Sequence, residues 1–271
     1  MSGPAGARLD WSMPWFAPWR EPGERIAGLH AQGVPVHEAL AREVGPLRFV
    51  AQDALPPGEA YETFILRTGC CPTRDNLHDF FNGLAWLKFP QAKRQLNQLQ
   101  AAEIESGRRH ARGPVRDAIT VFDENGALLH APPQLWVALG ERDWQRLFVG
   151  LRPLWAQARL LLFGHALLEK MAAPRKEVTA HVWRANAPSG AAFDDDWLAG
   201  QFTPARLGAK NFTPLPLSGV PGWWPGNEEV SFYDDRRVFR PPRSRGLDSA
   251  RPVPMCSASR PPPAHGENEP T

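Results

Sequence analysis

The chain has 271 residues, 42% of them hydrophobic, and a formal net charge of +2. This length and composition allow a sizeable core within one main domain. The small net charge excludes strong attraction of nucleic acid or anionic membranes by the overall field, so binding of that kind would need a local basic patch.

The cysteines do not suggest a disulfide framework, because there are three of them and Cys70 and Cys71 are adjacent. The pair also lacks the two-residue gap of a redox or zinc motif. Prolines and charges interrupt the start of the chain before a signal-peptide core can form, and the longest apolar run, near Leu160, is too short to span a bilayer. We therefore expect a soluble, cytoplasmic protein with reduced thiols.

We predict three segments along the chain. Residues 1–20 form an N-terminal arm held to the core by its aromatic side chains, residues 21–240 form a single globular domain, and residues 241–271 form a disordered tail. The tail is rich in Pro, Arg and Ser and lacks periodic apolar residues, so it has little surface with which to dock.

Helices and strands mix in the first half of the domain. Apolar spacing behind a proline predicts a short helix over residues 35–44. Two runs rich in strand-forming residues, 47–52 and 61–67, predict a hairpin. The stretch 76–105 predicts two helices broken at Pro90, which together form a helical hairpin.

The second half opens with another predicted hairpin. Residues 118–122 and 127–130 are its expected strands, because the Asn-Gly pair between them suits a tight turn. Helices are predicted over 164–171 and 194–202, and a strand over 178–183.

These elements define the expected fold class. They predict an α+β fold in which helices pack on a small, mostly antiparallel sheet. A turn-rich, aromatic C-terminal loop over residues 213–240 is expected to wrap the core and close it.

Five strings in one order carry a family resemblance: TRDNLHDFFNGLAWLKFPQAKRQLN, RDAITVFDENGALL, FGHALLEK, PLPLSGVPGWW and FYDDRRVFR. Through them the chain resembles an uncharacterised bacterial family, domain of unknown function 3025, from about Trp11 to Arg240. The resemblance implies a shared fold and a bacterial origin. It implies no activity, cofactor or ligand.

His78 and Asn82 lie four residues apart and so share one face of the first predicted helix of the helical hairpin, in line with Trp86 and Phe89. Polar groups within an apolar stripe need partners or a task. In a catalytic interpretation, His78 acts as a general base and Asn82 orients it or binds substrate. In the structural interpretation, which we favour, His78 is a core histidine bonded to Asn82, Asn97 or a backbone carbonyl.

His165 and Glu169 form a second pair four residues apart. The pair can turn an imidazole and a carboxylate towards one metal ion, or form a base with its orienting partner. Two ligands do not complete a site, and a third would have to be His78, Asp79 or Asp117. The second histidine of an HExxH zinc helix is missing, so the metal and any cofactor are left unassigned, and a capped helix with an exposed Glu169 is the commoner explanation.

Arg116, Asp117, Asp123 and Glu124 flank the predicted strand over residues 118–122. Carboxylates at strand ends often supply acid or metal chemistry, although all four residues also suit ordinary turns. We rank Asp117 above Asp123, because Asp123 fits the first position of the predicted turn. Asp117 is expected to pair with Arg116 or to support His78.

Arg108, Arg109 and Arg112 lie in a basic connector between predicted elements. Such a connector can bind an anionic ligand. A solvated connector is the default interpretation, since no aromatic residues that would stack on bases separate the charges.

Two hypotheses for function follow. The first is a metal-independent or weakly metal-assisted enzyme of the hydrolase type, with a polar pocket made by five residues: His78, Asn82, Asp117, His165 and Glu169. The alternative is a non-catalytic protein- or nucleic-acid-binding module that uses the basic connector and the aromatic loop. The sequence does not decide whether the protein is an enzyme. Two imidazoles facing one cavity would favour the first hypothesis, and imidazoles on opposite sides would favour the second.

Overall fold

The computed structural model describes residues 9–106, 113–185 and 193–241. The chain divides into a compact unit over Met1–Pro241 and a second unit over Pro242–Thr271. The predicted disordered tail and the arginines of the basic connector lie outside the described residues.

Ten α-helices are found in the described part of the chain. The first five are α1 (Arg20–Ala31), α2 (Val36–Ala41), α3 (Tyr61–Thr68), α4 (Leu77–Lys88) and α5 (Pro90–Glu105). The others are α6 (Pro114–Asn125), α7 (Pro133–Glu141), α8 (His165–Ala172), α9 (Asp195–Gln201) and α10 (Pro204–Gly208). None of the described helices is long and apolar enough to cross a membrane.

The strands form two separate sheets. They are β1 (Arg48–Ala51), β2 (Cys70–Thr73), β3 (Gly126–His130), β4 (Arg159–Leu162), β5 (Thr179–Arg184) and β6 (Thr213–Pro216). The larger sheet has the order β4-β3-β5-β6, with antiparallel outer pairs and a parallel β3–β5 pair. The smaller sheet is the parallel pair β1–β2. The α+β class and the mostly antiparallel larger sheet are therefore confirmed.

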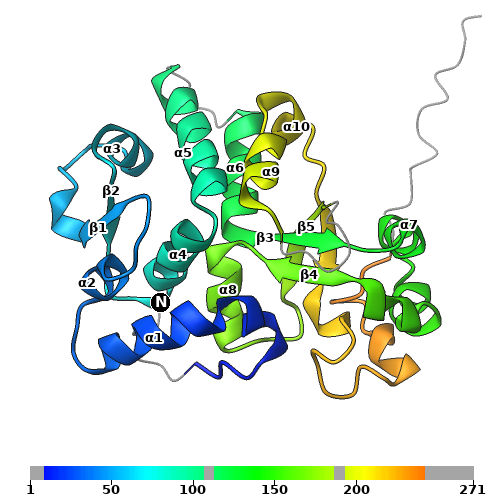
Figure 1. The fold of residues 1–271 in the computed structure, drawn as a ribbon. Coiled ribbons are helices and arrows are strands. Elements are labelled where there is room, and N and C mark those ends of the chain that lie inside the picture. The colour runs from blue at the N-terminus through cyan, green and yellow to red at the C-terminus, as the bar shows by residue number, and fades with distance from the viewer. Residues whose placement is uncertain (1–8, 107–112, 186–192, 242–271) are drawn as a thin grey trace, which may run out of the picture. The chain divides into compact units, whose positions relative to one another are not determined.

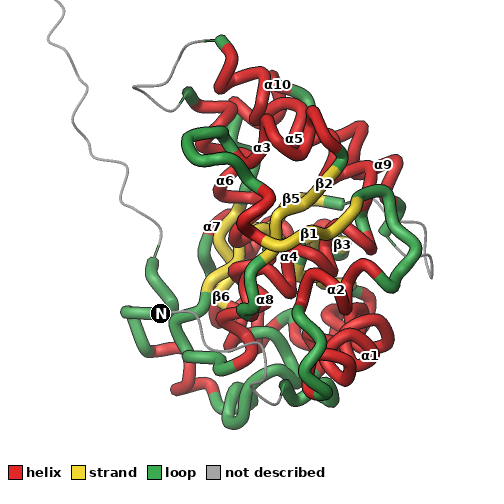
Figure 2. Tube along the Cα trace, turned by 90° about the vertical axis from the view of Figure 1, so that its left-hand side faces the viewer, coloured by secondary structure: helices red, strands yellow, loops and turns green. Residues whose placement is uncertain are grey.

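Helix α4 occupies the middle of this arrangement. Figure 1 places it between the small sheet and the four-stranded sheet, and Figure 2 is viewed from the side of the small sheet. It packs against α8 and α5, and α6 in turn packs against both α5 and α8. Four helices, α4, α5, α6 and α8, thus meet beside the larger sheet, and the candidate site lies among them.

The first predicted hairpin is wrong. Residues 48–51 do form a strand, but the second run is helix α3, and β1 pairs in parallel with Cys70–Thr73. A short apolar run does not by itself distinguish a strand from a buried helix. The missed signal is Gly69, which ends α3 with a φ of 65°, a left-handed helix cap that glycine adopts freely.

The second predicted hairpin is also wrong, because residues 118–122 lie inside α6. Pro114 starts this helix, and its buried residues Ala118, Ile119 and Phe122 follow helical spacing. Gly126 has a φ of −76°, so it does not make the positive-φ turn expected of Asn-Gly. Glycine is needed here for space, since a Cβ would lie 2.3 Å from the carbonyl oxygen of Phe122.

Several other predicted elements are confirmed: the helical hairpin α4–α5, the short helix α2, helices α8 and α9, and strand β5. Asn76 begins α4, because its side chain accepts a hydrogen bond from the amide of Asp79 at 2.8 Å. Asp194 caps α9 in the same manner through the amide of Trp197.

Aromatic residues of the N-terminal segment pack onto the helices that carry the site. Trp15, Phe16 and Trp19 are buried. Phe16 stacks on Phe81 of α4, and the indole nitrogen of Trp15 donates to the carbonyl of Met171 in α8 at 3.1 Å. These contacts stabilise the relative position of α4 and α8.

Candidate metal centre

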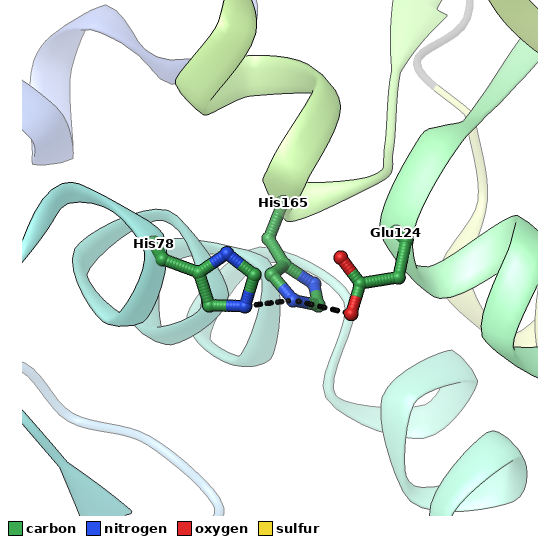
Figure 3. Close-up of side chains that lie close together, drawn as sticks. All are labelled: His78, Glu124 and His165. Atoms are coloured by element: carbon green, nitrogen blue, oxygen red, sulfur yellow. Dashed lines mark hydrogen bonds and ion pairs between the residues drawn. The ribbon is translucent and has the colours of Figure 1, made fainter. Parts of the chain in front are cut away.

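Two histidines that are far apart in sequence meet at the junction of three helices. His78 lies in the first turn of α4, and His165 is the first residue of α8. Their Nε2 atoms are 3.0 Å apart, and Oε1 of Glu124, near the end of α6, lies 3.6 Å from the His165 Nε2 (Figure 3). One ligand atom from each residue falls within 4.8 Å of the others.

The close approach of α8 to α6 depends on Gly164. The amides of Phe163 and Gly164 both donate to the carbonyl of Gly126, at 3.0 and 2.8 Å. A Cβ at position 164 would lie 2.4 Å from the backbone oxygen of Glu124. Only glycine fits this approach, which sets the backbones of Glu124 and His165 side by side.

Each imidazole has a carboxylate behind it. The Nδ1 atom of His78 is 3.1 Å from Oε2 of Glu169, within hydrogen-bond distance, whereas Nδ1 of His165 is 3.8 Å from Oδ2 of Asp123 and has no hydrogen-bond partner among the described residues. A carboxylate near Nδ1 favours the tautomer with its proton there, which leaves the lone pair on Nε2. In this tautomer the Nε2 lone pair of His78 is directed at the Nε2 atom of His165, beside the Glu124 oxygen.

The surroundings shift the pKa values of three groups at this junction. Burial lowers the pKa of His165 to about 3, so its imidazole is neutral near pH 7. Burial raises the pKa of Glu124. Burial alone would also raise the pKa of Asp123, but the charge and hydrogen bond of Lys93 together with the two nearby histidines outweigh it, and the pKa is lowered.

Lys93 is the centre of a buried polar network next to the histidines. Its ammonium group is 2.5 Å from Asp123 Oδ1 and 2.9 Å from Asn82 Oδ1. Asn82 in turn donates to the hydroxyl of Tyr61 at 2.9 Å. The network neutralises the charge of Asp123 and holds this carboxylate near His165.

The histidine cluster opens onto a cavity of about 430 Å³. Its walls are mainly polar and come from α3 to α6, the start of α8 and nearby loops. The lining residues include Tyr61, Glu62, Arg74, His78, Asp79, Asn82, Trp86, Lys93, Asn97, Gln100, Arg116, Thr120, Asp123, Glu124 and His165. A cluster of metal-ligand types at a polar cavity of this size can hold both an ion and a small substrate.

The structure brings most of the predicted site residues together, although in different roles. His78 and His165 face one cavity. Glu169 contacts His78, whereas the sequence suggested that it would join His165 at one metal ion. Asn82 lines the cavity but bonds Lys93 and Tyr61. The structural interpretation gives His78 a bond to Asn82, Asn97 or a backbone carbonyl, whereas its ring nitrogens bond Glu169 and His165.

Asp117 is misplaced by the sequence prediction. Its carboxylate forms an ion pair with Lys210, and among the described residues it is not part of the cavity wall. The error follows from the wrong hairpin: in a strand, Asp117 and Asp123 would flank the element, whereas in α6 they lie on different faces. Asp123 and Glu124, at the end of α6, reach the histidines instead.

Sequence reasoning missed Lys93 as part of the site, and it named Glu124 only among four charged residues at the ends of a predicted strand, without placing it beside the histidines. No spacing rule links Glu124 to His165, because the contact depends on how α6 and α8 pack. Lys93 did carry a signal: it lies on the same helical face as Leu96, Asn97 and Gln100, all buried. A charge on a buried face requires a partner.

The fold and the cluster together define an α+β protein with two histidines and one carboxylate at the head of a polar cavity. A family model described as "Protein of unknown function (DUF3025)" matches residues 47–243. The chain belongs to this family, and His78, Glu124 and His165 all lie in the matched region. Searches of curated proteins and of solved structures gave no match.

Proposed function

We propose that the protein is a metal-dependent hydrolase in which His78, His165 and Glu124 hold one divalent transition-metal ion. The observation that carries the proposal is the convergence of three ligand atoms, two imidazole Nε2 and one carboxylate oxygen, within 4.8 Å of one another. Two nitrogens and one oxygen are a ligand set common to catalytic zinc sites.

A metal ion accounts for the cluster better than a shared proton does. A proton between the two Nε2 atoms would satisfy the imidazoles, but it would leave the Glu124 oxygen, 3.6 Å away, without a role. A metal ion uses all three atoms. Glu169, bonded to Nδ1 of His78, supplies an outer carboxylate of the kind that orients metal-bound histidines, and Asp123 places a second carboxylate 3.8 Å from Nδ1 of His165.

Three protein ligands leave a coordination position open towards the cavity. When bound, zinc would lower the pKa of a water molecule there and polarise a substrate carbonyl. The ammonium of Lys93, held by Asp123 and Asn82, places an N–H donor on the same wall. A donor near a reacting carbonyl stabilises the oxyanion that forms during hydrolysis.

Metal binding is the first test. We expect the purified protein, stripped with a chelator, to bind one equivalent of Zn²⁺ in a calorimetric titration. His78→Ala, His165→Ala and Glu124→Gln should each weaken this binding at least about tenfold while circular dichroism and thermal unfolding stay close to wild type. His37→Ala is the matched control, because His37 is outside the cavity wall. Equal zinc affinity in wild type and all three variants would remove the proposal.

Hydrolysis is the second test. A panel of chromogenic esters and amides should be turned over by the zinc-loaded protein, and His165→Ala should abolish that turnover. Turnover that survives both chelation and His165→Ala would place the reaction elsewhere.

We also infer that the protein works in a bacterial cytoplasm. The family resemblance supports the origin. The thiols of Cys70 and Cys71, buried and free of disulfides, support a reducing compartment.

A further inference from the structure

We propose that the end of the cavity away from the histidines binds a carboxylate group of the substrate, with Arg116 as its counter-ion. The substrates would be peptides or acylated amino acids with a free carboxylate, whose amide carbonyl lies at the metal. This deepens the proposed function and rests on it for the reaction, whereas binding of the carboxylate itself needs no metal.

Helix α6 runs along the cavity, with a basic residue at one end of its cavity face and an acidic residue at the other. Arg116, Thr120 and Glu124 are spaced by four residues, so they lie along one face, and all three line the cavity. Eight residues of helix rise about 12 Å, so Arg116 begins about that far along the axis from the Glu124 metal ligand. The cavity therefore has a histidine end and an arginine end.

Helix α5 forms the facing wall, and it too has one end near the histidines and one end near Arg116. It ends at Glu105 shortly before α6 begins at Pro114, so the two packed helices run antiparallel. The Lys93–Asp123 ion pair joins them at the histidine end. Seven residues on from Lys93 is Gln100, and seven residues before Asp123 is Arg116, so these two side chains lie at the opposite end.

The charges of the cavity single out Arg116. Arg74 pairs with Asp79 at 2.9 Å, and Lys93 pairs with Asp123 at 2.5 Å. No carboxylate of the described residues lies within ion-pair distance of Arg116, and its buried Nε has no acceptor. A guanidinium offers five N–H donors in a fork that matches a carboxylate. The terminal nitrogens of Arg116 can therefore bind a carboxylate of the substrate.

The groups near Arg116 define what should accompany the carboxylate. Gln100 donates through Nε2 to Glu62 Oε1 at 3.2 Å, and its own Oε1 is buried without a donor. A carboxylate with a neighbouring N–H group, as at the end of a peptide, complements this combination of cation and acceptors. The negative Glu62 also disfavours a bare, highly charged anion such as phosphate.

The reaction balances with water as the only co-reactant. Water loses one proton to the solvent as its oxygen adds to the amide carbon, and the C–N bond then breaks. The nitrogen takes one proton from the solvent side of the cavity and leaves as an amine, so no net proton is consumed up to this point. The products are one carboxylate and one amine that still carries the carboxylate held by Arg116.

Ligand binding tests the subsite directly. Acetyl-alanyl-alanine and its C-terminal amide differ only in the carboxylate, and calorimetry or quenching of Trp86, which lines the cavity, can follow both. With zinc-loaded and with chelator-stripped protein, we expect the free acid to bind at least about tenfold tighter than the amide. Inorganic phosphate, the third probe, should bind more weakly than the acid.

Variants assign the preference to Arg116. Arg116→Gln should bring the acid and the amide to equal affinity, while Arg94→Gln, which removes an exposed arginine of α5 outside this cavity, should leave the preference intact. Thermal unfolding of both variants checks that the fold is retained. Equal binding of acid and amide by wild type, no binding of either, tighter binding of phosphate, or an intact preference in Arg116→Gln would each overturn the proposal.

The two proposals fail separately. If the protein prefers the acid but neither binds zinc nor hydrolyses amides, the carboxylate subsite is supported and the hydrolase proposal is contradicted. If the protein binds zinc and hydrolyses amides without a preference for the acid, the hydrolase proposal is supported and the carboxylate subsite is contradicted.

Discussion

Two buried polar regions of this protein differ in how their hydrogen bonds are satisfied. Around Asn227, which is 0% exposed, every group has a partner: its Nδ2 donates to the carbonyls of Ser218 and Val220, and its oxygens accept from Arg152 and Tyr233. Around the two histidines, two imidazole nitrogens and one carboxylate oxygen, all atoms of metal-ligand type, lie within 4.8 Å of one another. A satisfied polar network stabilises a fold, whereas a cluster of metal-ligand atoms suits a cation.

The largest expected effect falls on the satisfied region. Asn227→Ala would leave two carbonyls and part of Arg152 without partners in the core, so the free energy of unfolding should fall by about 3 kcal/mol. Urea unfolding followed by circular dichroism measures this. Asn211→Ala, at an exposed position, is the control and should change little. The zinc affinity of the folded Asn227 variant should match that of wild type. A lower zinc affinity would contradict the assignment of a purely structural role to the Asn227 region.

A second prediction concerns the buried Lys93–Asp123 pair. Lys93→Met should lower the free energy of unfolding by about 2 kcal/mol near neutral pH, because Asp123 would lose its counter-charge. The same change at Lys210, in an exposed pair with Asp117, should cost less than about 1 kcal/mol. A similar small cost at both sites would contradict the structural role of Lys93.

The Lys93 prediction also has a pH dependence. The pKa of Asp123 is lowered in the folded protein, so its ionised form contributes stability that is present above the unfolded pKa and is lost as the pH falls through the folded pKa. Unfolding curves of wild type and Lys93→Met should therefore converge below about pH 4. A constant difference from pH 7 to pH 3 would assign the effect to packing instead.

Glu169→Gln probes the group behind His78. The change keeps the shape but removes the charge that favours the Nδ1 proton of His78, so zinc affinity should fall about tenfold with little change in stability. Glu141→Gln, at an exposed position, gives the reference value for the calorimetric titration. Unaltered zinc affinity in Glu169→Gln would mean that His78 does not need this carboxylate.

The smallest effect is expected at Cys71. Burial raises the pKa of its thiol to about 11, and its sulfur lies 3.1 Å from the Tyr61 hydroxyl. Iodoacetamide at pH 8 should therefore modify Cys71 only after unfolding, as peptide mass spectrometry can show. Rapid alkylation in the native protein would contradict the burial of this thiol against Tyr61.

The sequence predicted the parts of this architecture that depend on local rules. The helical hairpin α4–α5 follows from apolar periodicity and Pro90, and the position of His165 at the start of α8 follows from the pattern around Gly164. The α+β class followed from the mixture of such elements. Local rules failed at Asp123-Glu124-Asn125-Gly126, where a helix end passing directly into a strand resembles a hairpin turn.

The composition of the site was only partly predictable for the same reason. His78 and Glu169 were identifiable as polar groups on helices, but their contact joins residues 91 positions apart. Glu124 reaches His165 only because α6 and α8 meet through Gly164, which no spacing in the sequence reveals. Lys93 was detectable in principle, since a lysine on a buried helix face implies a partner.

X-ray absorption at the zinc edge of the zinc-loaded protein tests the central claim most directly. We predict a first shell of nitrogen and oxygen atoms at about 2.0–2.1 Å, with the outer-shell signature of two imidazoles that falls to one in His78→Ala and in His165→Ala. A protein that retains no zinc, or a first shell with sulfur at about 2.3 Å, would contradict the His78–His165–Glu124 centre.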